Sequence, residues 1–534
     1  MSCGTDRLRA APENGDLPAE DVVGRDRLVG NVLASWGGHL VFVIAGFIMP
    51  RLIDRRLGQE VLGIWDFAWS LVAYFSFIQG GVASAVNRYV AKHRASNDAE
   101  GVNRAVSSAA CLLGIAGAIV VGLAITAAWL LPVLFGDRLG AHTRNTQWVV
   151  LFLGLGIAVE TTSSVFSGVI TGCHRWGVHN AIKGGCHAAS VSAMIAALFL
   201  GGGLMALAAA ILAGLVVAAL ARWRMAVRVC PGLQVRPGLA RGRVARDMLG
   251  FGGKTLVPSI ANLLLLQTTS VLILMYLGPL ELAMFARPLS LIRQLNTVVA
   301  KFAFVLTPTS SAMDAINTRA ELKSLLVRSV RYAAYLVIPV ILLFVLHGDG
   351  ILGLWMGRRY ENGTILAILA LGYLPTLVQA PALGILSGLN AHGRPGLANL
   401  VAALVCIGLS IVALSSMKLG LTGVALGIAL PLAVANGVYL PIYCCRRLGL
   451  RLSQFVPETM IGPLLCAAPF GLCLLAARVG VRSNPTTAFV LGAVVGGPIL
   501  LLVYWRYVVP VSIRRRVIHR FGRPARSAVR RLDV

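Results

Sequence analysis

The sequence predicts an all-α, polytopic membrane protein with about 14 transmembrane helices, arranged as two six-helix lobes plus a C-terminal helix pair. Three observations predict this fold class. Hydrophobic residues make up 57% of the 534 residues and charged residues only 13%, whereas soluble domains average about 25% charged. The mean hydropathy is +0.78. Apolar runs of about 20 residues, enough to cross a bilayer core, recur along the whole chain.

This composition excludes several classes of protein. A soluble enzyme cannot bury so much apolar side chain, because surface grows too quickly with size. A disordered chain requires low hydrophobicity. The 48 Lys and Arg against 21 Asp and Glu give a net charge of +27. Because these basic residues lie between apolar runs rather than on one folded face, we expect no nucleic-acid partner.

Apolar runs and their Gly, Pro and charged breaks define the candidate spans. They are 30–50, 61–86, 105–134, 148–172, 181–201, 204–222, 249–277, 280–306, 331–356, 363–388, 396–416, 419–443, 458–478 and 485–508.

An even number of spans places both termini on one side of the membrane. With the termini in the cytoplasm, 34 Lys and Arg lie inside, 10 lie outside and 4 lie within spans, which satisfies the positive-inside rule. The basic excess therefore serves orientation and contact with anionic lipid heads. The predicted units are a flexible cytoplasmic tail (1–27), an N-terminal six-helix lobe (28–222), a basic cytoplasmic linker (223–248), a C-terminal six-helix lobe (249–445), an additional helix pair (458–508) and a basic cytoplasmic tail (509–534).

The first and seventh spans carry the same pattern. Stretches beginning at Gly30 and Gly250 each run to a Leu-Gly pair, at 57–58 and 277–278, and a Glu follows soon after each pair. The offset between the two stretches is about 220 residues. Repeated halves are a feature of secondary transporters, whose substrate sites lie between the halves near mid-membrane.

Two segments carry a resemblance to a known family. They are Pro50-Arg51-Leu52-Ile53 with Leu57-Gly58-Gln59-Glu60, Leu62-Gly63-Ile64-Trp65 and Gly80 to Ala91, and the short loop Ser387 to Arg394. The chain resembles the polysaccharide biosynthesis and O-antigen flippases of the multidrug/oligosaccharidyl-lipid/polysaccharide exporter superfamily. The resemblance implies two six-helix lobes around a central cavity, a bacterial inner-membrane location and movement of a lipid-linked sugar across the bilayer.

Four basic residues lie inside predicted spans: Lys254, Arg287, Arg293 and Lys301. At about 100° per residue, Arg287 and Lys301 lie about 40° apart on one helix, and Arg293 lies about 80° from Lys301. Charges in a bilayer are costly and mark functional paths. We interpret the four as an anion path for a polyprenyl-pyrophosphate head group, because Arg binds phosphate bidentately. The alternative is that the lysines snorkel to the interface and that neighbouring carbonyls or helix ends neutralise the arginines.

Two acidic residues lie within spans. With one residue inserted in the repeat, Asp66 falls opposite Arg287, and we predict that the two pair at the outer end of the cavity when the outside is closed. The alternative is an interfacial Asp66. Glu160 precedes a run of Thr and Ser, where it either couples transport to H⁺ or Na⁺ or hydrogen-bonds across helices as a structural group.

The leading functional hypothesis is a flippase for lipid-linked oligosaccharides that works by alternating access. A cation-coupled multidrug exporter and a peptidoglycan-precursor flippase are the alternatives. An excess of basic over acidic residues within the spans favours an anionic cargo. An enzyme is disfavoured, because no large loop carries paired carboxylates or a metal cluster. We expect no cofactor and no metal, and as partners the bilayer, a polysaccharide polymerase and glycosyltransferases.

Overall fold

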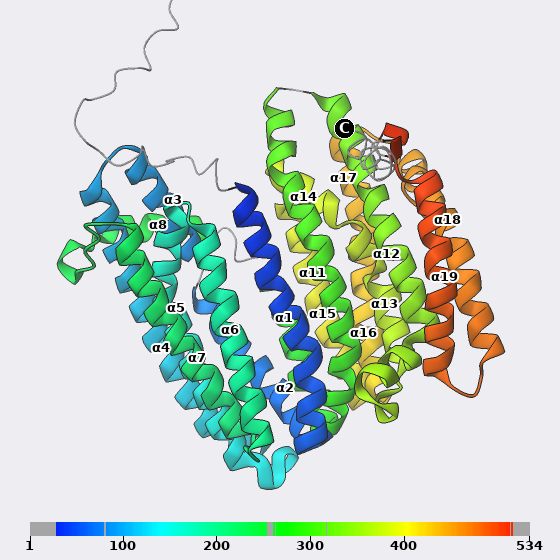
Figure 1. The fold of residues 1–534 in the computed structure, drawn as a ribbon, viewed down its shortest axis with the longest axis horizontal. Helices are drawn as coiled ribbons and strands as arrows, with labels where there is room; N and C mark the ends of the chain where they lie inside the picture. The colour runs from blue at the N-terminus through cyan, green and yellow to red at the C-terminus, as the bar shows by residue number, and fades with distance from the viewer. Residues whose placement is uncertain are drawn as a thin grey trace, which may run out of the picture.

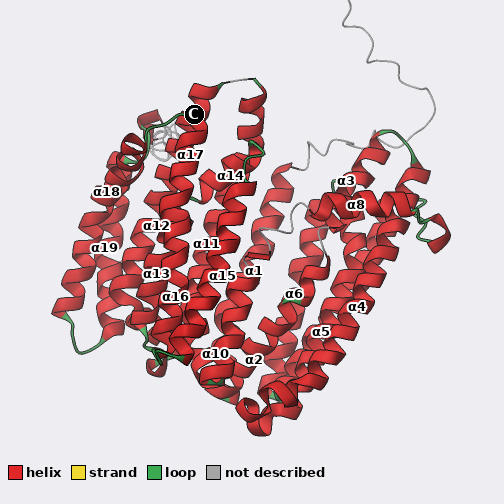
Figure 2. Ribbon diagram, turned by 180° about the vertical axis from the view of Figure 1, so that it is seen from behind, coloured by secondary structure: helices red, strands yellow, loops and turns green. Residues whose placement is uncertain are grey.

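The computed structural model describes residues 28–515 apart from 80–81, 254–259, 262, 317 and 513. The described residues form helices joined by short turns and loops, with no strand among them (Figure 2). The predicted tail 1–27 and most of the predicted tail 509–534 lie outside the described residues. Large apolar side chains such as Trp129 and Val133 are exposed on the helices. Such surfaces require lipid around them.

The N-terminal lobe is a bundle in which α1 packs on α6, α4 on α5, and α7 on both α5 and α6 (Figure 1). Its elements are α1 (Leu28–Leu57), α2 (Gln59–Ala73), the 3₁₀ turn η2 (Phe75–Gln79), α3 (Val82–Ala95), α4 (Ala99–Leu139), η3 (Gly140–His142), α5 (Thr143–Gly172), α6 (Trp176–Phe199) and α7 (Leu204–Val229). The turn η4 (Pro237–Leu239) and α8 (Gly242–Gly253) follow. Helix α8 packs on α3 and α4, so part of the segment predicted as a linker is an ordered helix on this lobe.

The C-terminal lobe packs α12 on α13, α13 on α16, α15 on α16 and α11 on α14. Its elements are the π-helical turn η5 (Leu264–Thr268), α10 (Thr269–Leu277), α11 (Pro279–Ala315), α12 (Arg319–Met356), η6 (Arg358–Tyr360), α13 (Gly363–Val378), α14 (Ala380–Gly388), α15 (Gly393–Ser415), α16 (Gly420–Val434), the π-helical turn η7 (Ala435–Tyr439) and α17 (Leu440–Leu448). The final pair, α18 (Leu452–Gly480) and α19 (Pro485–Tyr507), packs on α12.

The predicted all-α membrane fold is confirmed. By length and composition, 11 continuous helical stretches among the described residues could cross a membrane. One of these stretches contains both α4 and α5, and α1 and the shorter apolar helix Leu264–Leu277 complete a set of fourteen. Helices α7, α11 and α12 extend beyond the predicted spans. Their additional turns carry Arg, Asp and Thr residues, so they continue past the apolar core into the polar interface.

The two lobes meet mainly at one end. Contacts between lobes join α2 to α10 and α11, and α1 to α12. We call this end, formed around residues 57–59 and 277–279, the closed end. Toward the opposite end, where α1 begins and α19 finishes, the two groups of helices diverge (Figure 1). We call that the open end.

The two repeat turns have nearly the same backbone conformation. Gly58 has φ 99° and ψ 164°, and Gly278 has φ 96° and ψ 177°. Each glycine begins the next helix, α2 or α11. These positive φ values are readily adopted by glycine alone. The Leu-Gly pairs therefore mark structurally equivalent turns at the closed end of the two lobes.

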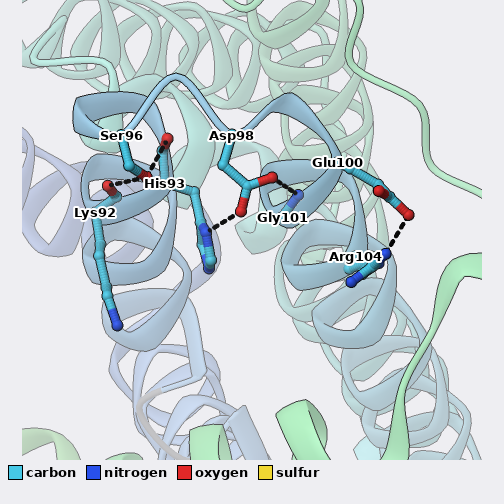
Figure 3. Close-up of polar contacts among 7 residues, drawn as sticks. All are labelled: Lys92, His93, Ser96, Asp98, Glu100, Gly101 and Arg104. Atoms are coloured by element: carbon cyan, nitrogen blue, oxygen red, sulfur yellow. Dashed lines mark hydrogen bonds and ion pairs between the residues drawn. The ribbon is translucent and has the colours of Figure 1, made fainter.

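The α3–α4 turn at the open end is fixed by side-chain hydrogen bonds (Figure 3). The carboxylate of Asp98 accepts from the backbone N–H of Gly101 at 2.7 Å and from His93 Nδ1 at 2.9 Å. This is an N-cap that satisfies a free N–H of α4. The Gly101 N–H, with a further contribution from His93, holds the pKa of the Asp98 carboxyl below its usual value. Glu100 and Arg104 form an ion pair one turn further along.

Candidate functional site

A buried ion pair joins the two lobes near the closed end. Arg287 on α11 donates from Nη2 to the carboxylate of Asp66 on α2. The Arg287 side chain is only 4% exposed and that of Asp66 is 21% exposed. The two residues that the repeat places opposite each other therefore do form a pair.

A second carboxylate, which sequence reasoning missed, joins the lobes nearer the closed end. Asp54 on α1 is fully buried and accepts from Arg359 and from the hydroxyl of Tyr360, the latter at 2.7 Å. Both partners belong to the short turn η6 of the C-terminal lobe. A buried carboxylate requires partners of this kind, because desolvation of an unpaired charge is costly.

Hydrogen bonds from side chains to backbone carbonyls, and close packing at a glycine, also join the two lobes at the closed end. Trp355 Nε1 donates to the carbonyl of Phe47 at 2.8 Å, and Arg51 Nη1 donates to the carbonyl of Leu354 at 3.0 Å. Gly63 on α2 lies directly against Pro279, the first residue of α11, so that a Cβ at Gly63 would overlap the Pro279 carbonyl. The side-chain size at this glycine therefore decides how closely α2 approaches α11.

The remaining predicted cations are placed differently. Arg293 is exposed on α11, and it is near enough to act electrostatically on Asp66. Among the described residues it has no carboxylate within ion-pair distance. Lys301 is half-buried further along α11 toward the open end, and Lys254 lies outside the described residues. Gln294 lies between Arg287 and Lys301 in the sequence of α11. Its side chain reaches α1, where its Nε2 would lie 3.3 Å from a Cβ added at Gly46.

Glu160 forms an ion pair within the N-terminal lobe. Its Oε2 accepts from Arg222 Nη1 at 2.7 Å, and the same nitrogen donates to Ser163 Oγ at 3.1 Å. Arg222 on α7 is 3% exposed. Arg222 is the last residue of the predicted span 204–222. The guanidinium occupies one side of the Glu160 carboxylate.

Two of the missed residues differ in what the sequence could have revealed. Asp54 follows Phe47 and Arg51 at spacings of seven and three residues, which places all three on one helical face once α1 is extended to Leu57. That extension was the missing signal, because a run of charges after Pro50 is typical of a loop. Arg222 and Glu160 are 62 residues apart, and nothing local indicates that they pair.

The described residues contain no group of three or more His, Cys, Asp or Glu that could hold a metal ion. The side chains that gather at the lobe interface are instead guanidinium groups, carboxylates and aromatic rings. Such a set can bind anions and polar groups and can form or break ion pairs.

Fold and site together define a multi-pass α-helical membrane protein whose two lobes are held by ion pairs at one end. The chain belongs to the polysaccharide biosynthesis protein family, whose pattern it matches over residues 28–314. It is 24% identical over 458 residues to the uncharacterized membrane protein EpsK of Bacillus subtilis (strain 168), covering 82% of this chain and 86% of the relative. It is 22% identical over 384 residues to a putative O-antigen transporter of Shigella flexneri, covering 68% and 86%.

Solved structures share the fold. The lipid II flippase MurJ in an inward closed conformation aligns with a TM-score of 0.68 at 13% identity, covering 90% of this chain and all of that one. An inward-facing MATE family transporter of the MOP superfamily aligns with a TM-score of 0.65 at 16% identity, covering 78% and 95%. The resemblance found from the sequence motifs is therefore confirmed at the level of family and fold.

Proposed function

We propose that this chain is a flippase that moves polyprenyl-pyrophosphate-linked oligosaccharides from the cytoplasmic to the outer leaflet by alternating access. The observation that carries the proposal is the Asp66–Arg287 pair at the closed end, with Arg293 and Lys301 following on the same helix toward the open end. Membership of the polysaccharide biosynthesis family and the likeness to a putative O-antigen transporter support a lipid-linked sugar as the cargo.

The arrangement of charges suits an anionic cargo. A pyrophosphate that enters from the open end first meets Lys301 and then the exposed Arg293, with Lys254 as a proposed fourth member of the path. Guanidinium groups hydrogen-bond phosphate oxygens and keep their charge when buried. Arg287 lies at the end of this path and is held by Asp66.

The Asp66–Arg287 pair then acts as a gate by exchange of anions. A phosphate that reaches Arg287 competes with the Asp66 carboxylate for the same guanidinium. Once Asp66 is released, one of the two ion pairs described between the lobes is lost, and α2 is free to part from α11. The guanidinium remains paired with an anion throughout, which avoids leaving a buried charge without a partner.

The proposed orientation places both termini, and with them the open end, in the cytoplasm of a bacterial inner membrane. The predicted excess of Lys and Arg on that side supports this orientation. A cytoplasmic open end admits a cargo that is assembled by glycosyltransferases on the inner leaflet. A polysaccharide polymerase is the proposed consumer on the other side.

Glu160 is the proposed group for ion coupling, and its pairing with Arg222 sets a condition on that role. A proton or Na⁺ has to share the carboxylate with the Arg222 guanidinium or compete with it. Replacing Glu160 with Gln, which keeps the shape, should remove any dependence of transport on the H⁺ or Na⁺ gradient. A gradient dependence that survives in Glu160→Gln would assign this residue a structural role.

The experiment that tests the function is an analysis of intermediates in a strain that lacks the gene. We expect completed lipid-linked repeat units to accumulate in the cytoplasmic leaflet, where an external glycosidase cannot reach them. Sensitivity to cationic dyes with normal surface polysaccharide would instead identify a multidrug exporter. Trapped lipid-linked peptidoglycan precursor would identify a peptidoglycan flippase. Either of these two results would overturn the proposal.

A further inference from the structure

A separate pocket of about 430 Å³ lies within the N-terminal lobe, between α1, α2, α5, α6 and α7. Its volume falls in the range of about 300–1,000 Å³ that is usual for small-molecule sites. Its lining is largely apolar and includes aromatic rings as well as charged and hydroxyl groups. None of the proposed anion-path cations lines this pocket.

The aromatic lining residues come from α1, α2 and α6. The rings of Trp65 and Trp69 lie edge to face with centroids 6.2 Å apart. Phe42 stacks on His187 with centroids 3.9 Å apart and an angle of 14° between the planes. The ammonium group of Lys183 lies 5.6 Å from the centre of the Phe42 ring. These rings form flat apolar faces beside groups that can donate hydrogen bonds.

The polar lining residues include the Glu160–Arg222 pair and Ser190. Arg222 uses one nitrogen for both Glu160 and Ser163. Among the described residues its Nε is buried without a hydrogen-bond partner. A buried donor of this kind favours a ligand that supplies an oxygen acceptor, because leaving it unpaired costs free energy.

We propose that this pocket binds a sugar ring of the cargo, an inference that rests on the proposed flippase function. A pyranose has apolar C–H faces that pack on aromatic rings and a rim of hydroxyls that bond to charged side chains. The pocket offers both surfaces. Lys183 and Arg222 against Glu160 give it a net positive charge, so a cationic drug is disfavoured and a neutral or acidic saccharide is favoured.

Helix α2 connects this pocket to the gate. At about 100° per residue, Trp65 and Trp69 lie about 40° apart and share one face of α2, whereas Asp66 lies on the adjacent face. From that adjacent face, Asp66 pairs with Arg287 of the other lobe. A sugar held against the tryptophans therefore contacts the same helix that has to move when the gate opens. Recognition of the saccharide and release of the gate act on one rigid element.

Binding can be measured on the sugar itself. The probe is the soluble oligosaccharide released from the host's surface polysaccharide, titrated against the full chain in lipid nanodiscs and observed by saturation-transfer NMR. We expect Trp69→Leu to weaken binding roughly tenfold, since an aromatic contact is worth up to about 1.5 kcal/mol. Lys183 is at an exposed position of the pocket. Lys183→Gln should weaken the binding of an acidic oligosaccharide more than the binding of a neutral one.

The matched control is Trp129→Leu, because Trp129 is 73% exposed on α4 and belongs to no part of the pocket. It should leave binding unchanged. Absence of saccharide binding by the wild-type chain would overturn the proposal, and so would equal binding by wild type and both pocket variants. Displacement of the sugar by tetraphenylphosphonium would show that the pocket accepts cations and would also count against it.

A flipping assay separates this inference from the function on which it rests. Wild type and variants are reconstituted in liposomes with the complete lipid-linked oligosaccharide and, separately, with the bare polyprenyl pyrophosphate. We expect Trp69→Leu to slow the glycosylated cargo about tenfold relative to the bare carrier. Equal slowing of both substrates, or of neither, would reject the sugar pocket while leaving the flippase intact. No flipping by wild type would reject the function itself.

Discussion

The two ends of the lobe interface differ in what holds them. At the closed end, Asp54 and Asp66 each pair with an arginine of the other lobe, and a glycine allows α2 to lie directly on α11. Toward the open end, α11 carries an exposed Arg293 and a half-buried Lys301. The cross-lobe hydrogen bonds and ion pairs described above all lie on the closed-end side. The closed end therefore holds the lobes together, and the open end is the entrance in the mechanism that we propose.

This difference indicates how the molecule can change state at modest cost. Each lobe keeps its own packed helices, while the packing of α2 on α11 and the polar contacts beside it set the relation between the lobes. A change in this relation has to separate α2 from α11 as well as break the ion pairs. Rigid-body motion of two halves around a central site is the usual means of alternating access in repeat-built transporters.

The largest expected effect comes from breaking the Asp66–Arg287 pair. Removing one partner of a buried pair costs about 3–5 kcal/mol, so Asp66→Arg and Arg287→Asp should each nearly abolish export and shift spin-label distances across the closed end. The double variant Asp66→Arg with Arg287→Asp should recover part of both. If the swap recovers nothing while all three proteins insert normally, the pair is not a gate.

A smaller effect is expected from steric separation of α2 and α11. In Gly63→Ala the added methyl overlaps the Pro279 carbonyl, and overpacking of this kind costs about 1–3 kcal/mol. Export should fall about tenfold, and a thiol probe should reach the closed end more readily. Gly114→Ala on α4 is the control, because a Cβ there meets nothing within 4 Å. Equal export by the two variants would contradict this account of the closed end.

A still smaller effect is expected from weakening the contacts of Asp54, the second carboxylate at the closed end. Tyr360→Phe removes one hydrogen bond to Asp54 and leaves the Arg359 contact in place. The expected loss is about 1 kcal/mol in the population of the closed state. Double electron–electron resonance across the closed end would detect it as a minor second distance. An effect as large as that of Asp66→Arg would mean that Tyr360 does more than support Asp54.

The smallest effect concerns the α3–α4 turn of the open end and depends on pH. The pKa of Asp98 is lowered by the Gly101 N–H, so the cap stabilises the fold above the unfolded pKa of about 3.9 and loses this contribution as pH falls through the folded value. Asp98→Ala should therefore lower the melting temperature slightly at pH 7, and its difference from wild type should shrink as the pH approaches 3. A constant difference at all pH values would contradict the titration of Asp98.

The fold could be predicted from the sequence because long apolar runs identify bilayer spans. The repeat at Gly58 and Gly278 also placed Asp66 opposite Arg287, with which it pairs. The sequence was insufficient for Asp54, because a run of charges after Pro50 obscured the last turn of α1. It was also insufficient for the Glu160–Arg222 pair and for the aromatic pocket. These depend on contacts between distant helices, which helical packing sets and local patterns do not encode.

The central claim is that the lobes must part at the closed end for a lipid-linked sugar to cross. Phe47 and Trp355 face each other there with ring centroids 5.0 Å apart. In a background without native cysteines, Phe47→Cys and Trp355→Cys can be joined by a short cleavable reagent and tested for flipping of lipid-linked oligosaccharide in liposomes. We predict that the joined protein does not flip and that cleavage restores the rate of the unjoined double variant. Flipping at an unchanged rate while the two residues remain joined would contradict the account.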